Sequence, residues 1–476
     1  MKFNQTPRSW RIVATLGPSS ESEETLEQLI CSGLTVARFN FSHGTHESHR
    51  ELAGTLRRVA SRLGEPVAIL QDLQGHKVRT GRVLGTEAVH LESGTTVLLG
   101  TGERIDDTRI GIDYEDITRH VEVGQKVYLD DGMIRLEVVA LDGGDLRCEV
   151  AVGGDLKSRK GVIFPDSDLS FPLINEKDLD DARVGLEVGV DMLAMSFVRS
   201  AAEILEMRQR LAQWGKPNSF VIAKIEDPMG VANLEDILYV ADTVLIARGD
   251  LGVTLPRECV PGVQKDIIRR ANARGVAVIT ATQMLESMTY FDQPTRAEVN
   301  DVYNAVLDGT DAVMLSGETA SGRYPVLALQ EMDRICSAAT KDRLCYSVGK
   351  LVEGRPGLHA QVAEAAARMA QTTAATCILA FSLSGVTLRA LSAARCPVPV
   401  YGVVAEEEVR RRLQLHWGLS VVTQPLQQDT ADLIDVMLRQ LVEQGICKPG
   451  DRIVVVGGTK KPRSPTSPTL KIHVVE

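Results

Sequence analysis

The stretch FVIAKIEDPMGVANLEDILYVADTVLIARGDLGV, residues 220–253, contains the pattern that decides the fold. Two short apolar runs, 220–225 and 243–247, have the composition of buried strands, and a helical pattern lies between them. Charged residues close both runs, with Lys224 and Glu226 at the first and Asp250 just after the second. This order predicts parallel strands whose polar side chains gather at their carboxyl ends.

Similar units recur on both sides of this stretch. The predicted strands are 11–15, 35–39, 67–72, 191–196, 220–225, 243–247, 276–280 and 311–315. Helical patterns, such as 23–31 and 261–274, separate most of them. Eight strand–helix units predict an α/β fold of the (β/α)8 TIM-barrel type, with its active site at the carboxyl ends of the strands.

Two segments depart from the barrel pattern. Between residues 75 and 158 the helical period gives way to glycine-rich turns and short alternating runs such as AVHLESGTTVLLG (88–100), which predict an inserted all-β domain. After residue 335, ATCILAFSLSG (375–385) begins a strand–loop–helix–strand order. We therefore expect a barrel at 1–74 and 159–335, a β-barrel lid at 75–158, and an α/β regulatory domain at 336–476.

Composition narrows the class of partners and the compartment. A net charge of −10 and an aromatic content of 4% provide neither a basic surface nor a stacking platform for nucleic acid. The first twenty residues contain no apolar core of signal-peptide length, so we expect no signal peptide, and no apolar run reaches membrane-spanning length. Its eight cysteines are scattered without a CxxC pair, which is typical of a reducing compartment. We expect a cytoplasmic protein that binds neither membrane nor nucleic acid.

The carboxyl ends of the fifth and sixth predicted strands carry the strongest chemical signal. Lys224 and Glu226 share one face of their strand, and Asp250 follows the neighbouring strand. Two carboxylates at adjacent strand ends suit a hard cation such as Mg²⁺. Three other interpretations stay open at this point: a buried ion pair, a Schiff-base lysine, and a tight turn capped by Asp250.

Polar side chains also follow most of the other predicted strands. In all, six of the eight strands end in or are followed by such polar or charged residues, which no barrel core requires. Besides the residues above, they are Arg38, Asn40, Ser42, His43, Asp72, Lys77, Arg79, Thr282, Ser316 and Glu318. Ser316 and Glu318 also suit the start of the following helix, where they would act only as caps.

These motifs together resemble one enzyme family. They are RIVATLGPSS, VARFNFSHG, DLQGHKVRTG, AKIED, ARGDLGV, TATQMLESM, PTRAEVNDV and AVMLSGETASG. In their order and spacing, and over nearly the whole chain, they are similar to pyruvate kinases of the bacterial type. The resemblance implies a glycolytic phosphotransferase that moves the phosphoryl group of phosphoenolpyruvate to ADP, giving pyruvate and ATP. It also implies a homotetramer.

The resemblance further implies a role for each motif residue. Glu226 and Asp250 would bind Mg²⁺, with Mn²⁺ as an alternative, and Lys224 would stabilise the phosphoryl group in transfer. Phosphoenolpyruvate would contact Arg38, Lys224, Gly249, Asp250 and Thr282. The nucleotide would contact Asn40, His43, Arg79 and Lys160. Water near Thr282 and Ser316 would supply the proton to enolpyruvate, and Arg248 would shape the turn after its strand.

One departure from the family concerns potassium. The resemblance places a K⁺ pocket at Asn40, Ser42, Asp72 and the residue after it. Relatives that require K⁺ carry Thr-Lys-Gly-Pro-Glu after the aspartate, whereas this chain has Leu73-Gln74-Gly75-His76-Lys77. A lysine ammonium group could replace the ion. The resemblance is thus to the potassium-independent group, and we expect that K⁺ is not required. Alternatively, Lys77 is a solvated hinge residue.

A second candidate site lies in the carboxyl-terminal domain. FSLSGVT (381–387) places Ser382, Ser384, Gly385 and Thr387 between a buried strand and a helix amino terminus. Hydroxyls, free amides and the helix dipole suit a phosphate group, so we expect a sugar-phosphate or nucleotide activator. Simple capping of the helix by Ser384 is the alternative.

Two other classes of protein compete with the kinase. A Mg²⁺-dependent lyase or mutase that acts on phosphoenolpyruvate would need neither a lid nor Arg79 and Lys160. A non-catalytic effector-binding protein would be expected to lack Lys224 or one of the two carboxylates, and all three are present.

Overall fold

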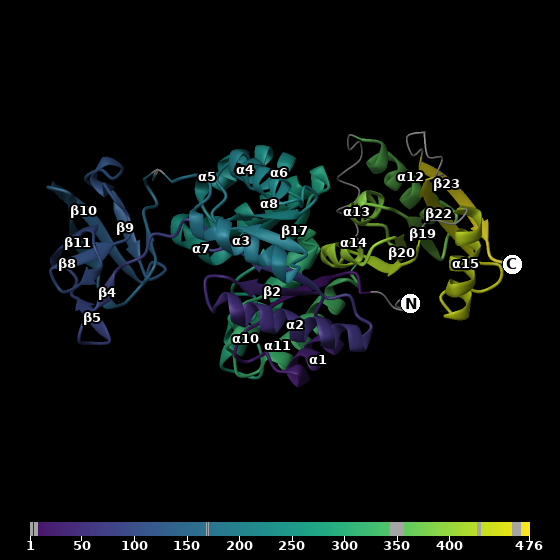
Figure 1. The fold of residues 1–476 in the computed structure, drawn as a ribbon, viewed down its shortest axis with the longest axis horizontal. Coiled ribbons are helices and arrows are strands. Elements are labelled where there is room, and N and C mark those ends of the chain that lie inside the picture. Colours follow the sequence, from purple (N-terminus) through teal and green to yellow (C-terminus); the bar gives the residue numbers. More distant parts are fainter. Residues whose placement is uncertain are drawn as a thin grey trace.

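A closed barrel of parallel strands forms the centre of the protein (Figure 1). The computed structural model describes residues 3, 8–167, 169, 171–342, 357–425, 430–458 and 468–476. The strand order around the barrel is β1-β18-β17-β16-β15-β14-β3-β2. These strands are β1 (Arg11–Thr15), β2 (Val36–Asn40), β3 (Ala68–Asp72), β14 (Met192–Met195), β15 (Phe220–Ile225), β16 (Thr243–Ala247), β17 (Ala277–Ala281) and β18 (Ala312–Leu315). The predicted TIM barrel is confirmed.

Helices surround the barrel, and α1, α2, α3 and α9 begin at side-chain caps and end at glycines. In α1, Ser22 accepts a hydrogen bond from the Thr25 amide, and Gly33 ends the helix at a φ of 116°. The longer helices are α1 (Glu23–Ser32), α2 (His46–Leu63), α3 (Glu176–Val188), α4 (Ala201–Gln213), α6 (Leu234–Val240), α8 (Val260–Arg274), α9 (Arg296–Asp308) and α11 (Pro325–Ala339). Shorter ones follow strand ends: α5 (Pro228–Ala232), α7 (Arg248–Thr254), α10 (Gly317–Ala320), and the 3-10 turns η2 (Arg257–Cys259) and η3 (Glu286–Thr289).

The inserted domain is built of strands and lies at one end of the molecule (Figure 1). Its larger sheet has the order β13-β9-β10-β11-β6-β8-β7-β4, and β12 pairs with β5. The elements are β4 (Arg82–Val83), β5 (Ala88–Leu91), β6 (Thr96–Thr101), β7 (Arg104–Ile105), β8 (Arg109–Ile112), η1 (Ile117–Arg119), β9 (Lys126–Leu129), β10 (Ile134–Asp142), β11 (Asp145–Val152), β12 (Gly154–Lys157) and β13 (Val162–Ile163). The sheet passes the predicted boundary at residue 158, because β13 pairs with β9.

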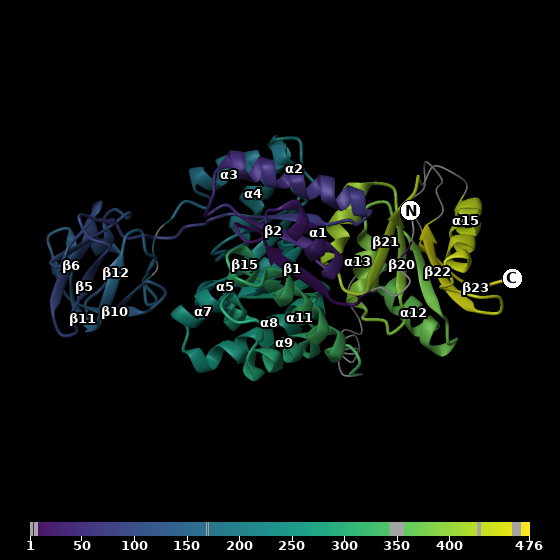
Figure 2. The same ribbon diagram turned by 90° about the horizontal axis from the view of Figure 1, so that it is seen from below.

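The carboxyl-terminal domain lies at the opposite end of the barrel from the lid (Figures 1 and 2). Its sheet has the order β21-β20-β19-β22-β23. The elements are α12 (Leu358–Thr372), β19 (Cys377–Phe381), α13 (Val386–Ala393), β20 (Val400–Val404), α14 (Glu407–Arg412), η5 (Leu413–Leu415), β21 (Leu419–Thr423), α15 (Thr430–Glu443), β22 (Arg452–Gly458) and β23 (Pro468–Val474). Helix α11 continues past the predicted boundary at residue 335, because Cys336 and Ala339 pack into the barrel core.

None of the helices within the described ranges combines the length and the apolar character that a membrane span needs.

Candidate active site

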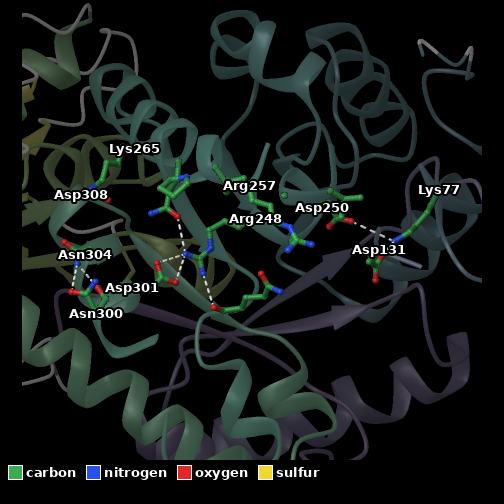
Figure 3. Close-up of a pocket in the computed structure, with 17 residues that line it drawn as sticks. Lys77, Asp131, Arg248, Asp250, Arg257, Lys265, Asn300, Asp301, Asn304 and Asp308 are labelled. Carbon is green, nitrogen blue, oxygen red and sulfur yellow. Dashed lines mark hydrogen bonds and ion pairs between the residues drawn. The ribbon is translucent and has the colours of Figure 1, made fainter. Parts of the chain in front are cut away.

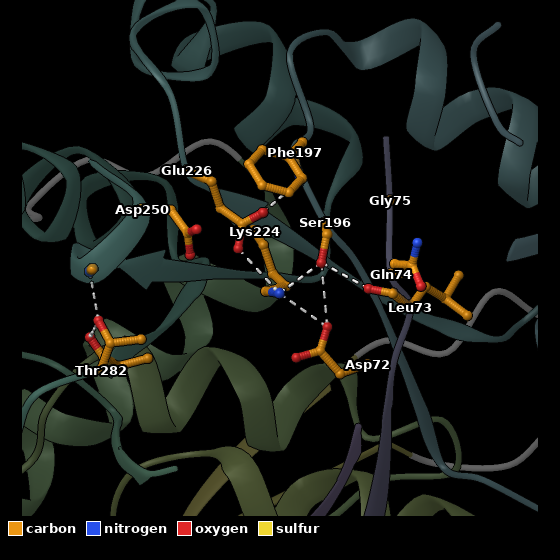
Figure 4. Close-up of polar contacts among 12 residues, drawn as sticks. Asp72, Leu73, Gln74, Gly75, Ser196, Phe197, Lys224, Glu226, Asp250 and Thr282 are labelled. Carbon is orange, nitrogen blue, oxygen red and sulfur yellow. Dashed lines mark hydrogen bonds and ion pairs between the residues drawn. The ribbon is translucent and has the colours of Figure 1, made fainter. Parts of the chain in front are cut away.

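A buried lysine lies at the centre of the polar cluster at the carboxyl ends of the barrel strands (Figure 4). Lys224 Nζ is 3.0 Å from Asp72 Oδ1 and 3.0 Å from Glu226 Oε1, and it donates a hydrogen bond of 2.6 Å to Ser196 Oγ. Burial acts to lower the pKa of Lys224, but the charges of Asp72 and Glu226 outweigh it and raise the pKa above its usual value. Lys224 is therefore a permanent cation, which disfavours the Schiff-base interpretation because that chemistry needs a free amine.

The two predicted metal ligands lie side by side above this lysine (Figure 4). Glu226 is 2% exposed and accepts a hydrogen bond of 2.7 Å from the Phe197 amide. Burial raises the pKa of Glu226 to about 7, although Lys224 opposes this. Asp250 lies in the first turn of α7 with a side chain that is 26% exposed. In the described part of the chain no group of three or more His, Cys, Asp or Glu residues could hold a metal alone. Two carboxylates at adjacent strand ends suit Mg²⁺, which takes its remaining ligands from substrate and water.

Asp72 connects Lys224 to a second cation, Arg38. Arg38 Nε lies 2.6 Å from Asp72 Oδ2, and its Nη1 donates to Thr15 Oγ1 at 2.8 Å. Burial acts to raise the pKa of Asp72, but Lys224 and Arg38 outweigh it and hold the pKa below its usual value. Asp72 therefore holds the two cations close to each other at the carboxyl ends of the strands. The sequence analysis missed Thr15 and Ser196, although each follows or ends a barrel strand.

The loops after β16 and β17 bring Gly249 and Thr282 together. The Gly249 amide donates to Thr282 Oγ1 at 2.7 Å, and Thr282 has a φ of 67°, which a β-branched residue rarely adopts. Arg248 supports this strained backbone, because its Nη2 donates to the Thr282 carbonyl at 2.6 Å and its Nη1 to Asp301 Oδ1 at 2.7 Å. The predicted turn at Arg248 is in fact the start of helix α7.

Ser316 is tied to the site through its backbone. Its amide donates to Glu318 Oε2 at 2.7 Å, and the Leu285 amide donates to Glu318 Oε1 at 3.1 Å. Burial raises the pKa of Glu318. Glu318 therefore joins the loops after β17 and β18, and Ser316 makes no side-chain capping bond to α10.

The predicted nucleotide residues form two groups. At the end of β2, Asn40 Oδ1 accepts from the Ser42 amide at 3.1 Å, and the exposed His43 follows. At the base of the lid, Arg79 forms an isolated bridge to Gly161, beside Lys160, whose Nζ lies 2.8 Å from Asp130 Oδ1. One group therefore lies on the barrel rim and the other on the inserted domain.

Lys77 faces the predicted metal site, whereas Leu73, directly after Asp72 in the predicted potassium pocket, has a buried side chain. In the described chain, the ion-pair partners of Lys77 Nζ are Asp131 Oδ1 at 3.7 Å and Asp250 Oδ1 at 3.9 Å (Figure 3). Leu73 is 1% exposed and packs into an apolar cluster, while its carbonyl accepts a hydrogen bond from Ser196 Oγ. The ammonium group thus faces a predicted metal ligand and borders a cavity of about 900 Å³.

Helix α3 binds the loops that follow β2 and β3, a role that the sequence analysis missed. Asp178 accepts from the amides of Gln74 at 3.1 Å and Gly75 at 3.0 Å, and burial raises its pKa to about 6. Lys177 Nζ donates to the Phe41 carbonyl at 3.0 Å. The only signal in the sequence is a cluster of charge at the start of a helix.

The predicted effector residues face different surroundings. Ser384 is exposed and lines a cavity of about 590 Å³ between the carboxyl-terminal domain and the barrel, together with Lys216 and Arg412. Thr387 Oγ1 instead lies 3.2 Å from His359 Nδ1, and Ser382 is buried. Gly385, with a φ of 81°, caps α13. Ser384 makes no side-chain bond to that cap.

A TIM barrel with a lysine, two facing carboxylates and an inserted β domain defines a metal-dependent barrel enzyme. The family model described as "Pyruvate kinase, barrel domain" matches residues 7–329, and "Pyruvate kinase, alpha/beta domain" matches residues 360–473. Pyruvate kinase of Staphylococcus aureus strain MRSA252 is 41% identical over 98% of this chain and 80% of its own length. That of Geobacillus stearothermophilus is 40% identical over the same shares. The chain belongs to the pyruvate kinase family and is a phosphotransferase.

Proposed function

We propose that this chain transfers the phosphoryl group of phosphoenolpyruvate to ADP, with Glu226 and Asp250 holding Mg²⁺. The observation that carries this proposal is the buried cation Lys224 beside two carboxylates at the carboxyl end of the barrel. A coupled assay of pyruvate release from phosphoenolpyruvate tests it. The release should depend on both ADP and Mg²⁺, and ADP-independent release would favour the lyase or mutase instead.

The residues of this site position the substrates and neutralise their negative charge, and they do not form a covalent intermediate. The bond between phosphorus and the enol oxygen breaks, and a terminal oxygen of ADP takes the phosphoryl group. Arg38 and Lys224 face the developing negative charge, and Asp72 holds both in place. A bound Mg²⁺ supplies charge neutralisation and orients the substrates. The lid would keep bulk solvent from the phosphoryl group during transfer. Enolpyruvate would then take a proton at carbon from a single water held near Thr282 and Ser316, and solvent would restore that proton when the lid opens.

We infer that the enzyme does not require K⁺, because Lys77 places its ammonium group 3.9 Å from Asp250 Oδ1 and so supplies a positive charge from the protein itself. Wild-type activity in a sodium-free Tris buffer should not increase on addition of K⁺. Lys77→Glu combined with Leu73→Thr should lower that activity roughly tenfold, which corresponds to about 1.4 kcal/mol of barrier, and added K⁺ should recover part of it.

The control for this prediction is Lys265→Glu, which reverses charge at another lysine of the same cavity, paired with Asp308. We expect that this control shows no new dependence on K⁺. Manyfold stimulation of the wild type by K⁺ would refute the inference.

We infer that a sugar phosphate or nucleoside monophosphate activates the enzyme at the loop around Ser384. The support is the cavity beside Ser384, whose wall includes the cations Lys216 and Arg412. A screen of such compounds should identify the activator. Ser384→Asp should then reduce the activation ratio to about one by charge repulsion, a loss on the order of 1–3 kcal/mol of coupling. Ser384→Ala is the control and should keep most of the activation. Unchanged activation in Ser384→Asp would move the site elsewhere.

The homotetrameric state and the cytoplasmic location are proposed from the family resemblance. Light scattering of the purified protein checks the first of these, because a tetramer would have about four times the mass of one 51.8 kDa chain.

A further inference from the structure

Three aspartates in equivalent positions lie at the amino-terminal end of the barrel, away from the active site. Each comes directly before a strand, and its Oδ2 accepts a hydrogen bond from an amide at the start of the adjacent strand. They are Asp191 before β14, bonded to Ile69 at 2.8 Å; Asp242 before β16, bonded to Val221 at 3.0 Å; and Asp311 before β18, bonded to Val278 at 2.8 Å. The arrangement fixes the starts of β3, β15 and β17.

The other oxygen of each aspartate binds an arginine of the carboxyl-terminal domain. The pairs are Asp191 Oδ1 with Arg411 Nε at 2.7 Å, Asp242 Oδ1 with Arg389 Nη1 at 3.1 Å, and Asp311 Oδ1 with Arg395 Nη2 at 3.0 Å. Asp191 and Asp311 are almost fully buried. Both side chains are buried only in the Arg395–Asp311 pair, whereas Arg411 and Arg389 are 23% and 32% exposed. A buried ion pair depends strongly on its geometry, so these contacts together constrain how the two domains sit on each other.

The three strands fixed in this way lead to the predicted catalytic groups. Strand β3 ends at Asp72, β15 contains Lys224 and precedes Glu226, and β17 precedes Thr282. On the other side of the contact, Arg389 lies in α13 and Arg395 just after it. Helix α13 begins directly after the Ser384–Gly385 loop. Helix α13 lies where the carboxyl-terminal domain meets the barrel (Figure 2), and this one helix connects the Ser384–Gly385 loop to two of the three arginines.

We propose that Arg389, Arg395 and Arg411 are positioning residues, which couple the orientation of the carboxyl-terminal domain to the catalytic ends of β3, β15 and β17. A change in the orientation of the carboxyl-terminal domain then alters the catalytic ends of the strands, and a ligand bound at those ends alters the domain, because energetic coupling between two sites is reciprocal. The proposal depends on the proposed function in one respect: it takes phosphoenolpyruvate and Mg²⁺ to bind at the carboxyl ends of these strands.

The structure offers a matched control for two of these pairs. Asp242 also binds Arg208 at 2.6 Å, and Asp191 also binds Arg57 at 2.6 Å, both from within the barrel. The double variants Arg389→Leu/Arg411→Leu and Arg208→Leu/Arg57→Leu therefore remove arginines from the same two carboxylates. Only the first double variant removes ion pairs between the domains, two of the three.

Hydrogen exchange of α13, measured with and without phosphoenolpyruvate and Mg²⁺ and in the absence of ADP, tests the proposal. In the wild type the ligands should slow exchange by roughly threefold to tenfold, the range of a coupling near 1 kcal/mol. The barrel double variant should keep this response. The interdomain double variant should lose it and should need about fivefold more phosphoenolpyruvate for half-maximal velocity, with a smaller change in kcat.

Arg389→Lys/Arg411→Lys keeps both charges and should restore part of the response; it also serves if the leucine variants do not fold. A full response in the interdomain double variant, or no response in a wild type that binds phosphoenolpyruvate by equilibrium dialysis, would overturn the proposal. Failure of the proposed function can be told apart from failure of this proposal, because in the first case the wild type would show no ADP-dependent pyruvate release.

Discussion

Asp250→Ala and Glu226→Ala should each lower turnover by roughly 10³-fold or more, because each removes a ligand and the charge that holds Mg²⁺. The two variants should differ in stability. Asp250 is partly exposed and its one ion-pair partner in the described chain is Lys77 at 3.9 Å, so its loss should change the melting temperature by only a few degrees. Glu226 is buried, and its loss leaves the Phe197 amide unpaired and should cost about 1–3 kcal/mol.

Steady-state turnover measured across a Mg²⁺ titration, with calorimetric melting of each variant, checks both parts. Asp131→Ala is the control, since it removes another carboxylate 3.7 Å from Lys77 without touching Glu226. We expect turnover of this control within about threefold of the wild type, because an exposed pair contributes little. Near-normal activity of Asp250→Ala or Glu226→Ala at low Mg²⁺ would show that the metal site lies elsewhere.

The barrel could be predicted because its strands are buried on both faces and so appear as short, continuous apolar runs. The observed bounds of β15, Phe220–Ile225, and of β16, Thr243–Ala247, are those predicted from the sequence. The helix at Arg248 was not predicted, because two glycines in seven residues lower its helix propensity, and packing against α8 and the β17 loop outweighs that deficit.

The place of Lys77 could not be predicted either. A lysine side chain has a long, flexible stem, and its partner is decided by how the inserted domain lies over α7. The sequence marks the aspartates before β14, β16 and β18 only weakly, because the one feature they share is a place directly before a strand. Their arginine partners are 220, 147 and 84 residues away in the chain, and no local pattern connects them.

Lys224→Met should also lower turnover by roughly 10³-fold, because it removes the cation that faces the phosphoryl group while keeping a side chain of similar length. It should leave Asp72 paired with Arg38 but Glu226 without its cation. Loss of one partner from a buried ion pair costs about 3–5 kcal/mol, so the variant should melt earlier than the wild type. Loss of stability alone could therefore be mistaken for loss of a catalytic group.

Metal affinity separates these two causes. With Lys224 gone, no ammonium group competes for the Glu226 carboxylate, but the pKa of Glu226 rises further. Mn²⁺ should therefore still bind, with an affinity that increases with pH, measured by calorimetry below the melting transition. A folded variant that binds Mn²⁺ but does not transfer the phosphoryl group would assign Lys224 to the transfer step. Lys265→Met, which breaks a lysine–aspartate pair on the outside of the barrel, controls for the loss of a charge and should keep both properties. If Lys224→Met instead lost Mn²⁺ binding together with turnover, the lysine would serve to organise the metal site and would have no separate role toward the phosphoryl group.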